Sequence, residues 1–229
     1  MTLKTTNNYL PYMKAYEKIT NIWSPYIMFK QRNLIKNNVV NTDKFGFRYT
    51  DDSGRYTILD DIKNKKNIDQ IAVIGNSTAF GVGASSDKKT IASLLCKKDK
   101  TKAYNLSLRT CNSFQELILF QQVMSKFEKL KTIIIISGFN DLLIDKYVEH
   151  KTLLNPPVFF QNRINSIDID SNTSILKKII KIFSNKNSFK TRAKLEIDKN
   201  FDWKKNFSKN IKIWSSIGKE FNFNIIYAL

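Results

Sequence analysis

The chain has 229 residues, of which 42% are hydrophobic, and it contains sixteen Phe, nine Tyr and three Trp. This supply of core-forming side chains excludes wholesale disorder, and the length suits one domain with an added arm or insertion. The formal net charge of +18 raises nucleic acid or an anionic membrane surface as partners. The basic residues are spread along the whole chain, so we favour a compositional bias and expect no nucleic acid partner.

The two cysteines, Cys96 and Cys111, stand apart without a CxxC or Cys/His spacing. This spacing indicates neither a zinc site nor a disulfide framework, so we expect buried free thiols and no metal. The sequence contains no run of ~18 to 20 apolar residues, and its N-terminus lacks the apolar stretch of a secretory signal. We therefore expect a cytoplasmic protein.

Residues 1–66 are polar, dotted with aromatic side chains and irregular in pattern. They contain one short helical candidate over 12–22, and turn signals at Asp43 and at 52–54. We interpret this region as an N-terminal arm that packs on the main domain, which would occupy residues 67–229.

Short apolar runs alternate with helical patterns from residue 71 onward. The run IAVIG ends in glycine and is typical of a strand buried on both faces, and TIIIIS is the strongest strand, which should be central. The candidate strands are IAVIG (71–75), KAYNLSL (102–108), TIIIIS (132–137) and FNIIYAL (223–229), and the helical patterns lie at 91–95, 113–127 and 207–221. Strands that alternate with helices predict an α/β fold with a parallel sheet.

Residues 146–200 interrupt this alternation with a Lys- and Asn-rich stretch. The stretch is longer than an ordinary connection, so we expect an inserted lid, binding loop or mobile segment. Within it, SILKKIIKIF (174–183) places isoleucines opposite lysines. A helix that covers the domain is the favoured interpretation, and a helix on a membrane surface is the alternative.

Three polar motifs follow the predicted strands, namely GNSTAFGVG (75–83), NLSLRT (105–110) and GFND (138–141). Ligand sites of parallel α/β sheets form where the carboxyl ends of the strands meet. Each motif alone has an ordinary interpretation, because the first lacks the spacing of a phosphate-binding loop and its serine can simply cap a helix. GFND can be a turn with a capping Asp. Their joint position is what indicates an active site.

Together the motifs resemble those of the SGNH (GDSL-like) hydrolases, whose namesake Ser, Gly, Asn and His lie in separate blocks. GNS is similar to the first block, with Ser77 as nucleophile and Asn76 in place of the usual Asp. GFND matches the third block, with Asn140 as an oxyanion donor. In the second block Ser107 stands where the family has glycine, and its backbone N–H would be a further donor. The resemblance covers roughly residues 70–145 and implies a three-layer α/β/α, flavodoxin-like fold.

The segment NTDKFGFR (41–48) is similar to a stretch before the core in family members associated with bacterial surface polysaccharides. The resemblance implies a serine ester hydrolase, and by analogy an acyl ester of a carbohydrate, such as an acetyl ester, as substrate. This mechanism needs no metal and no organic cofactor, and we expect neither.

The family takes its catalytic histidine from a D-x-x-H block after the last strand. This sequence holds one histidine, His150, ten residues past Asn140 and in the wrong place for that base, so we expect an ordinary histidine there. We expect either a C-terminally incomplete enzyme, which is the favoured interpretation, or a degenerate member. The alternative function is a non-catalytic module that binds a glycan or another small ligand, and a nucleic-acid-binding protein is the second rival.

Overall fold

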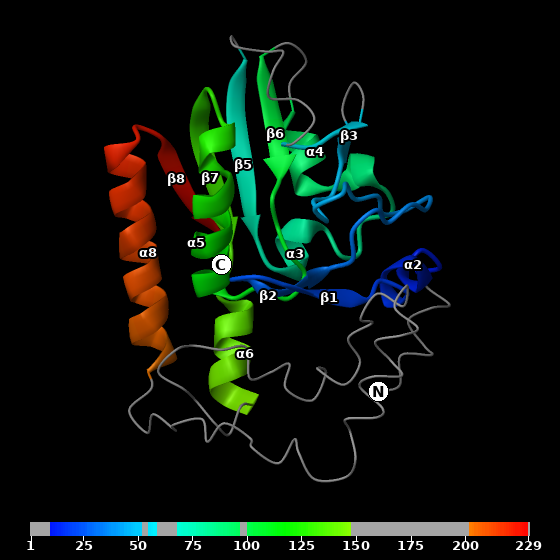
Figure 1. Cartoon of the computed structure of the whole chain (residues 1–229), viewed down its shortest axis with the longest axis horizontal. Helices are drawn as coiled ribbons and strands as arrows, with labels where there is room; N and C mark the ends of the chain where they lie inside the picture. Colours follow the sequence, from blue (N-terminus) through cyan, green and yellow to red (C-terminus); the bar gives the residue numbers. More distant parts are fainter. Residues whose placement is uncertain (1–9, 52–54, 59–67, 97–99, 148–201, 229) are drawn as a thin grey trace, which may run out of the picture.

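The computed structural model (Figure 1) describes residues 10–51, 55–58, 68–96, 100–147 and 202–228. Its centre is a four-stranded parallel sheet with helices packed on it, so the predicted α/β fold with a parallel sheet is confirmed. In spatial order the strands are β6 (Thr101–Asn105), β5 (Asp69–Gly75), β7 (Leu130–Ile136) and β8 (Asn224–Ala228).

Strand β5 sends alternate side chains into two separate clusters, as the two-residue period of a strand requires. Ala72 and Ile74 lie in the large core cluster that α5 and α8 complete, whereas Val73 lies in a second cluster that α3 and α4 complete. Both faces of β5 are therefore buried, which explains its continuous apolar sequence. The helices are α3 (Ser77–Phe80), α4 (Ile91–Leu95), α5 (Ser113–Val123), α6 (Phe139–Tyr147) and α8 (Trp203–Glu220).

The TIIIIS run forms most of β7, which is an inner strand between β5 and β8. Ile133 and Ile135 are buried, and Ile134 and Ile136 are half-buried. Strand β8 lies at the edge of the sheet and leaves Ile226 exposed.

Several boundaries differ from the predictions made from the sequence, and α8 begins at Trp203, four residues earlier than predicted. Strand β6 ends at Asn105 instead of 108, although Leu106 and Leu108 still donate backbone hydrogen bonds to β5. Helix α5 ends at Val123 and continues as a 3-10 turn, η2 (Met124–Lys126). Residues 146–147 belong to α6, and the rest of the predicted insertion, 148–200, lies outside the described residues.

The N-terminal segment, defined here as residues 10–51, is more regular than predicted. The expected helix over 12–22 is wrong in its second half, because residues 21–24 form a strand that pairs antiparallel with β2. The β-branched and aromatic residues at 20–23 favour this extended form. The elements are α2 (Met13–Glu17), β1 (Asn21–Ser24), β2 (Met28–Gln31) and β3 (Thr50–Asp51), which pairs with β4 (Arg55–Tyr56).

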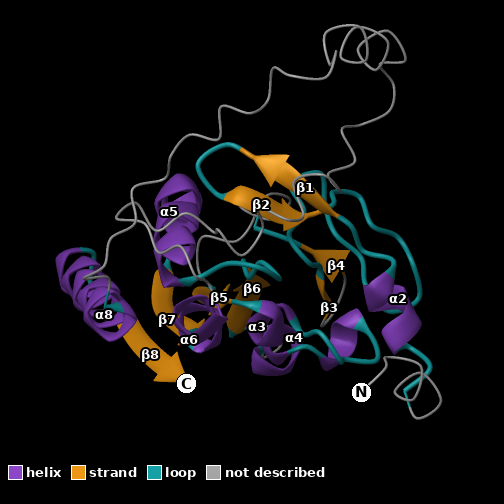
Figure 2. Cartoon of the chain, turned by 90° about the horizontal axis from the view of Figure 1, so that it is seen from below, coloured by secondary structure: helices purple, strands orange, loops and turns teal. Residues whose placement is uncertain are grey.

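The hairpin β1–β2 lies below the carboxyl ends of the sheet strands (Figure 1), and Figure 2 looks onto that edge of the molecule. Hydrogen bonds join the hairpin to the second polar motif, because the Arg109 amide donates to the Gln31 side chain and the Thr110 hydroxyl donates to the Phe29 carbonyl. In the part of the chain that the structure describes, no helix is long and apolar enough to cross a membrane.

The close approach of β5 to β7 requires glycine at position 75, and this requirement can be tested. Gly75 has φ +152°, and a methyl group there would overlap the Ile136 carbonyl and come within 2.8 Å of the Ala79 Cβ. We expect Gly75→Ala to lower the free energy of unfolding by about 3 kcal/mol, measured by urea denaturation. Gly83→Ala is the control, because its φ is also positive, at +97°, but nothing lies within 4 Å of the added methyl.

The control should cost only the backbone strain of about 1 to 2 kcal/mol. Equal losses in the two variants would contradict the close approach as the cause.

Candidate functional site

The three polar motifs meet at the carboxyl edge of the sheet. The Asn76 amide donates to the Ile136 carbonyl at 3.3 Å, and the Leu108 amide donates to the Gly75 carbonyl at 3.0 Å. Hydrogen bonds therefore join GNSTAFGVG to NLSLRT and to the end of β7, which GFND follows. In chain order the sheet strands run 2-1-3-4, so the order reverses between β5 and β7. Open α/β sheets bind ligands at this reversal point.

Ser77 is the first residue of α3 and makes no hydrogen bond there through its amide or its hydroxyl within the described residues. The adjoining Asn76 is the N-cap instead, because its side chain accepts from the Thr78 amide at 2.9 Å. The Ser77 side chain is thus left free of the capping task. Ser77 lies in the first turn of α3, where the free backbone N–H groups of a helix favour negative charge.

Asn140 is the second residue of α6 and is half-buried. Its Nδ2 donates to the Cys111 carbonyl at 2.6 Å, which fixes the orientation of the side chain against the loop before α5. A primary amide carries two N–H donors, and the second one has no hydrogen-bond partner among the described residues, so it can serve a ligand.

Ser107 is wholly buried, and its amide and its hydroxyl both make hydrogen bonds. Its amide donates to the Asn105 Oδ1 at 3.1 Å, and its hydroxyl donates to the Val73 carbonyl at 3.2 Å. The added serine side chain is therefore accommodated by its hydrogen bond to the backbone of β5. A donor role for the Ser107 amide requires that its hydrogen bond to Asn105 be released or shared.

A buried polar network anchors the helix that carries Asn140. Asp141 accepts hydrogen bonds from the Ser113 amide at 3.0 Å and from the Ser113 hydroxyl at 2.6 Å. Asn210 of α8 donates to the same hydroxyl at 2.8 Å. Burial raises the pKa of Asp141, and the two hydrogen bonds from Ser113 oppose that shift. The Asp of GFND thus joins α6 to α5 and α8, a role that the sequence pattern alone did not distinguish from a turn cap.

Glu116 is a second residue that sequence analysis missed. It lies in α5 with 1% of its surface exposed, and neither carboxylate oxygen has a hydrogen-bond partner among the described residues. The Ser137 hydroxyl at the end of β7 is buried close by without a hydrogen-bond partner there. Burial raises the pKa of Glu116 well above its ordinary value, the Ser137 hydroxyl opposes the shift, and the charge of Asp141 adds to it. Only its position inside an apolar helical pattern signals this residue in the sequence.

The two cysteines were candidates for buried thiols, and His, Cys, Asp and Glu side chains are the usual metal ligands. Cys111 is a buried thiol, whereas Cys96 is half-buried, so the expectation of buried thiols fits only Cys111. Among the described residues, no group of three or more His, Cys, Asp or Glu side chains could hold a metal ion. His150 lies outside the described residues.

Comparison with known proteins leaves the family open. No protein-family model matches the sequence, and no curated protein is significantly similar to it. The chemistry that the described residues offer is a hydroxyl at a helix N-terminus, with an amide side chain following the adjacent strand.

The buried Glu116 predicts a pH-dependent stability. Its pKa is higher in the native protein than in the unfolded chain, so its contribution to the free energy of unfolding is fully present at low pH. That contribution is lost as the pH rises above about 4.3, the ordinary pKa of glutamate, towards the native pKa. We expect Glu116→Gln to gain stability relative to the unsubstituted protein as the pH rises above about 4.3, measured by thermal unfolding.

Glu128→Gln is the control, because Glu128 is exposed. A difference in melting temperature between Glu116→Gln and the unsubstituted protein that stays constant with pH would refute the shifted ionisation.

Proposed function

We propose that this chain is a serine ester hydrolase of the SGNH type, in which the Ser77 hydroxyl attacks an ester carbonyl. The observation that carries the proposal is the state of Ser77, whose amide and hydroxyl have no hydrogen bond within the described residues. Asn76 caps α3 instead of Ser77. Ser77 lies where the strand order of the sheet reverses. A serine that only capped a helix would have its hydroxyl engaged.

The oxyanion of the tetrahedral intermediate would be stabilised by the Ser77 amide and by the second N–H of the Asn140 side chain. Pre-aimed donors of this kind stabilise charge that develops only in the transition state. The hydrogen bond from Asn140 to the Cys111 carbonyl and the anchoring of Asp141 to Ser113 support a fixed donor. The Ser107 amide would be the third donor once its hydrogen bond to Asn105 is released.

We also propose the finer fold assignment, a three-layer flavodoxin-like sheet with residues 1–66 as an arm. The strand order 2-1-3-4 and the two clusters on opposite faces of β5 support it. The favoured substrate is an acyl ester of a carbohydrate, because the segment 41–48 resembles family members associated with surface polysaccharides. Nucleic acid is not a proposed partner.

The second candidate function is a non-catalytic module that binds a glycan or another small ligand at the same edge. It is favoured by the count of histidines, since the sequence holds only His150 and the family's base is not assigned. A serine hydrolase without its base retains only binding and oxyanion stabilisation, which give about 10³ to 10⁴ over water.

Covalent labelling with a fluorophosphonate probe tests the nucleophile. We expect Ser77→Ala to abolish labelling, and Asn140→Ala to slow it about 10²- to 10³-fold, because one oxyanion donor is lost. Ser85→Ala is the matched control, since Ser85 is an exposed serine eight residues further along the same loop and should leave the labelling rate unchanged. Labelling that survives Ser77→Ala would exclude the proposed nucleophile. Glycan binding without any labelling would favour the non-catalytic module.

Hydrolysis of an activated acetyl ester tests the base. We expect slow turnover that is insensitive to His150→Ala, because that histidine is not in the position of the family's base. A large fall in kcat in His150→Ala would make His150 the base. Efficient turnover that persists in His150→Ala and is lost in Ser77→Ala would require a different base.

A further inference from the structure

The helix that begins with Ser77 is a single turn, and single turns do not hold their shape alone. Its last carbonyls have partners from other parts of the chain. The side chain of Asn105 reaches the Ala79 and Phe80 carbonyls at 3.4 and 3.3 Å. The Tyr16 hydroxyl donates to the Gly81 carbonyl at 2.8 Å. The Ala84 amide donates to the same carbonyl at 3.0 Å, and Arg48 is a further donor to the end of this turn.

Arg48 Nη1 donates to the carbonyls of Phe80 and Gly81, at 3.2 and 2.9 Å. These oxygens belong to two successive peptide groups, whose N–H groups are those of Gly81 and Val82. Both N–H groups donate back to the Ser77 carbonyl, at 3.1 and 2.9 Å. The same two peptide groups thus accept hydrogen bonds from Arg48 through their oxygens and donate hydrogen bonds to Ser77 through their N–H groups.

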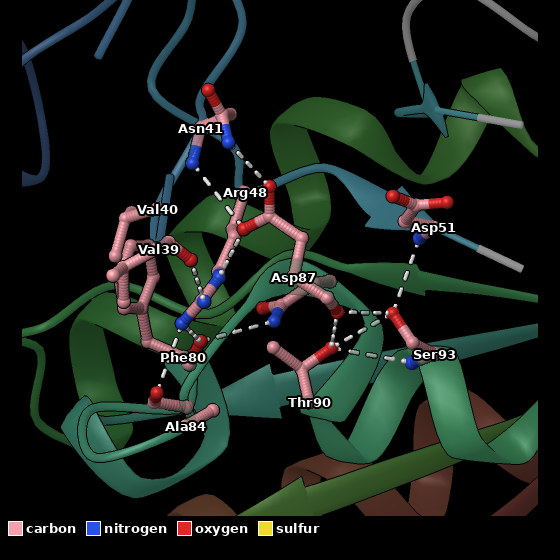
Figure 3. A network of polar contacts seen from close by, with 12 residues as sticks. Val39, Val40, Asn41, Arg48, Asp51, Phe80, Ala84, Asp87, Thr90 and Ser93 are labelled. Carbon is pink, nitrogen blue, oxygen red and sulfur yellow. Dashed lines mark hydrogen bonds and ion pairs between the residues drawn. The ribbon is translucent and has the colours of Figure 1, made fainter. Parts of the chain in front are cut away.

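The guanidinium is itself fixed from all sides. Arg48 has 0% of its surface exposed, and its Nε donates to Asp87 at 2.9 Å (Figure 3). Its Nη2 donates to the Val39 carbonyl at 2.8 Å. Asp87 also accepts from the amide and the side chain of Asn41, at 3.2 and 2.7 Å. A buried ion pair whose remaining lone pairs are satisfied has one well-defined geometry.

This arrangement explains the motif NTDKFGFR. Its first and last residues, Asn41 and Arg48, bind the same carboxylate of Asp87. Between them the side chain of Asp43 accepts from the amides of Phe45 and Phe47, which shapes the turn that brings the two ends together.

We infer that Arg48 is a positioning residue for Ser77, held in place by Asp87 and acting through the peptide groups of the Phe80–Gly81–Val82 turn. The inference rests on the proposed function of Ser77. A cation at the carboxyl end of the turn also complements its dipole. Gly81 has φ +88°, and an added methyl would lie 3.1 Å from Arg48 Nη1, so the glycine admits the guanidinium.

The test uses the double variant Arg48→Met/Asp87→Asn, which removes both charges together and so leaves no buried charge unpaired. The first readout is amide hydrogen exchange of Gly81 and Val82, which does not depend on catalysis. We expect their protection to fall at least tenfold, beyond the change in global stability. Phe47→Leu is the matched control, because Phe47 is buried in the same motif but packs in the large core cluster. In this control, the protection of these two amides should change only as much as the global free energy of unfolding changes.

The second readout is the rate at which the folded protein reacts with a fluorophosphonate probe. We expect at least a tenfold fall in Arg48→Met/Asp87→Asn, no fall in Phe47→Leu, and partial rescue in Arg48→Lys, since lysine offers a single point of donation. Unchanged protection of Gly81 and Val82 in the folded double variant would overturn the inference, whatever the outcome for Ser77→Ala.

A variant that keeps more of the network guards against failure to fold. Tyr16→Phe removes one donor to the Gly81 carbonyl and preserves the buried pair. It should loosen the same two amides to a smaller extent, and unchanged exchange there would count equally against the positioning role.

Discussion

The contact between β5 and β7 at Gly75 is the constraint on which the rest of the site depends. A side chain at this position would collide with the Ile136 carbonyl, so only glycine lets the two strands run together to their carboxyl ends. Because the strands end side by side, the residues that follow them, Ser77 and Asn140, leave the sheet from adjacent points. The order of the strands reverses here, which is the point at which open α/β sheets bind ligands.

Each of the two polar loops then has its own buried anchor. The loop after β5 is tied to Asp87 and Arg48, whereas the helix after β7 is tied through Asp141 to Ser113 and Asn210. Both anchors use a carboxylate with several donors, which sets direction as well as distance. The hydrophobic core supplies most of the favourable free energy of folding, and these buried polar groups set the orientation of the residues at the edge.

The strands were predictable because their apolar runs are short, β-branched and bounded by glycine or polar residues, as in IAVIG and TIIIIS. The site residues Ser77 and Asn140 could be placed at strand ends for the same reason. The hairpin β1–β2 was missed because its strands contain charged and polar residues and owe their form to pairing and to contacts with residues 109–115. The sequence did not predict the burial of Arg48, Asp87 and Glu116. Burial of a charged group depends on partners far away in the sequence, which hydrophobic periodicity does not reveal.

Several hydrogen bonds of the N-terminal segment span long stretches of sequence: 65 residues from Tyr16 to Gly81, 88 from Ile27 to Gln115 and 90 from Ile19 to Arg109. Contacts of such separation carry a high loop-closure cost and form late. During synthesis this segment emerges before residues 81–115, which supply these hydrogen-bond partners. Until those later residues have been made, Tyr16 and Phe47 lack the side chains that they pack against in the folded protein, so they are exposed to association with other chains.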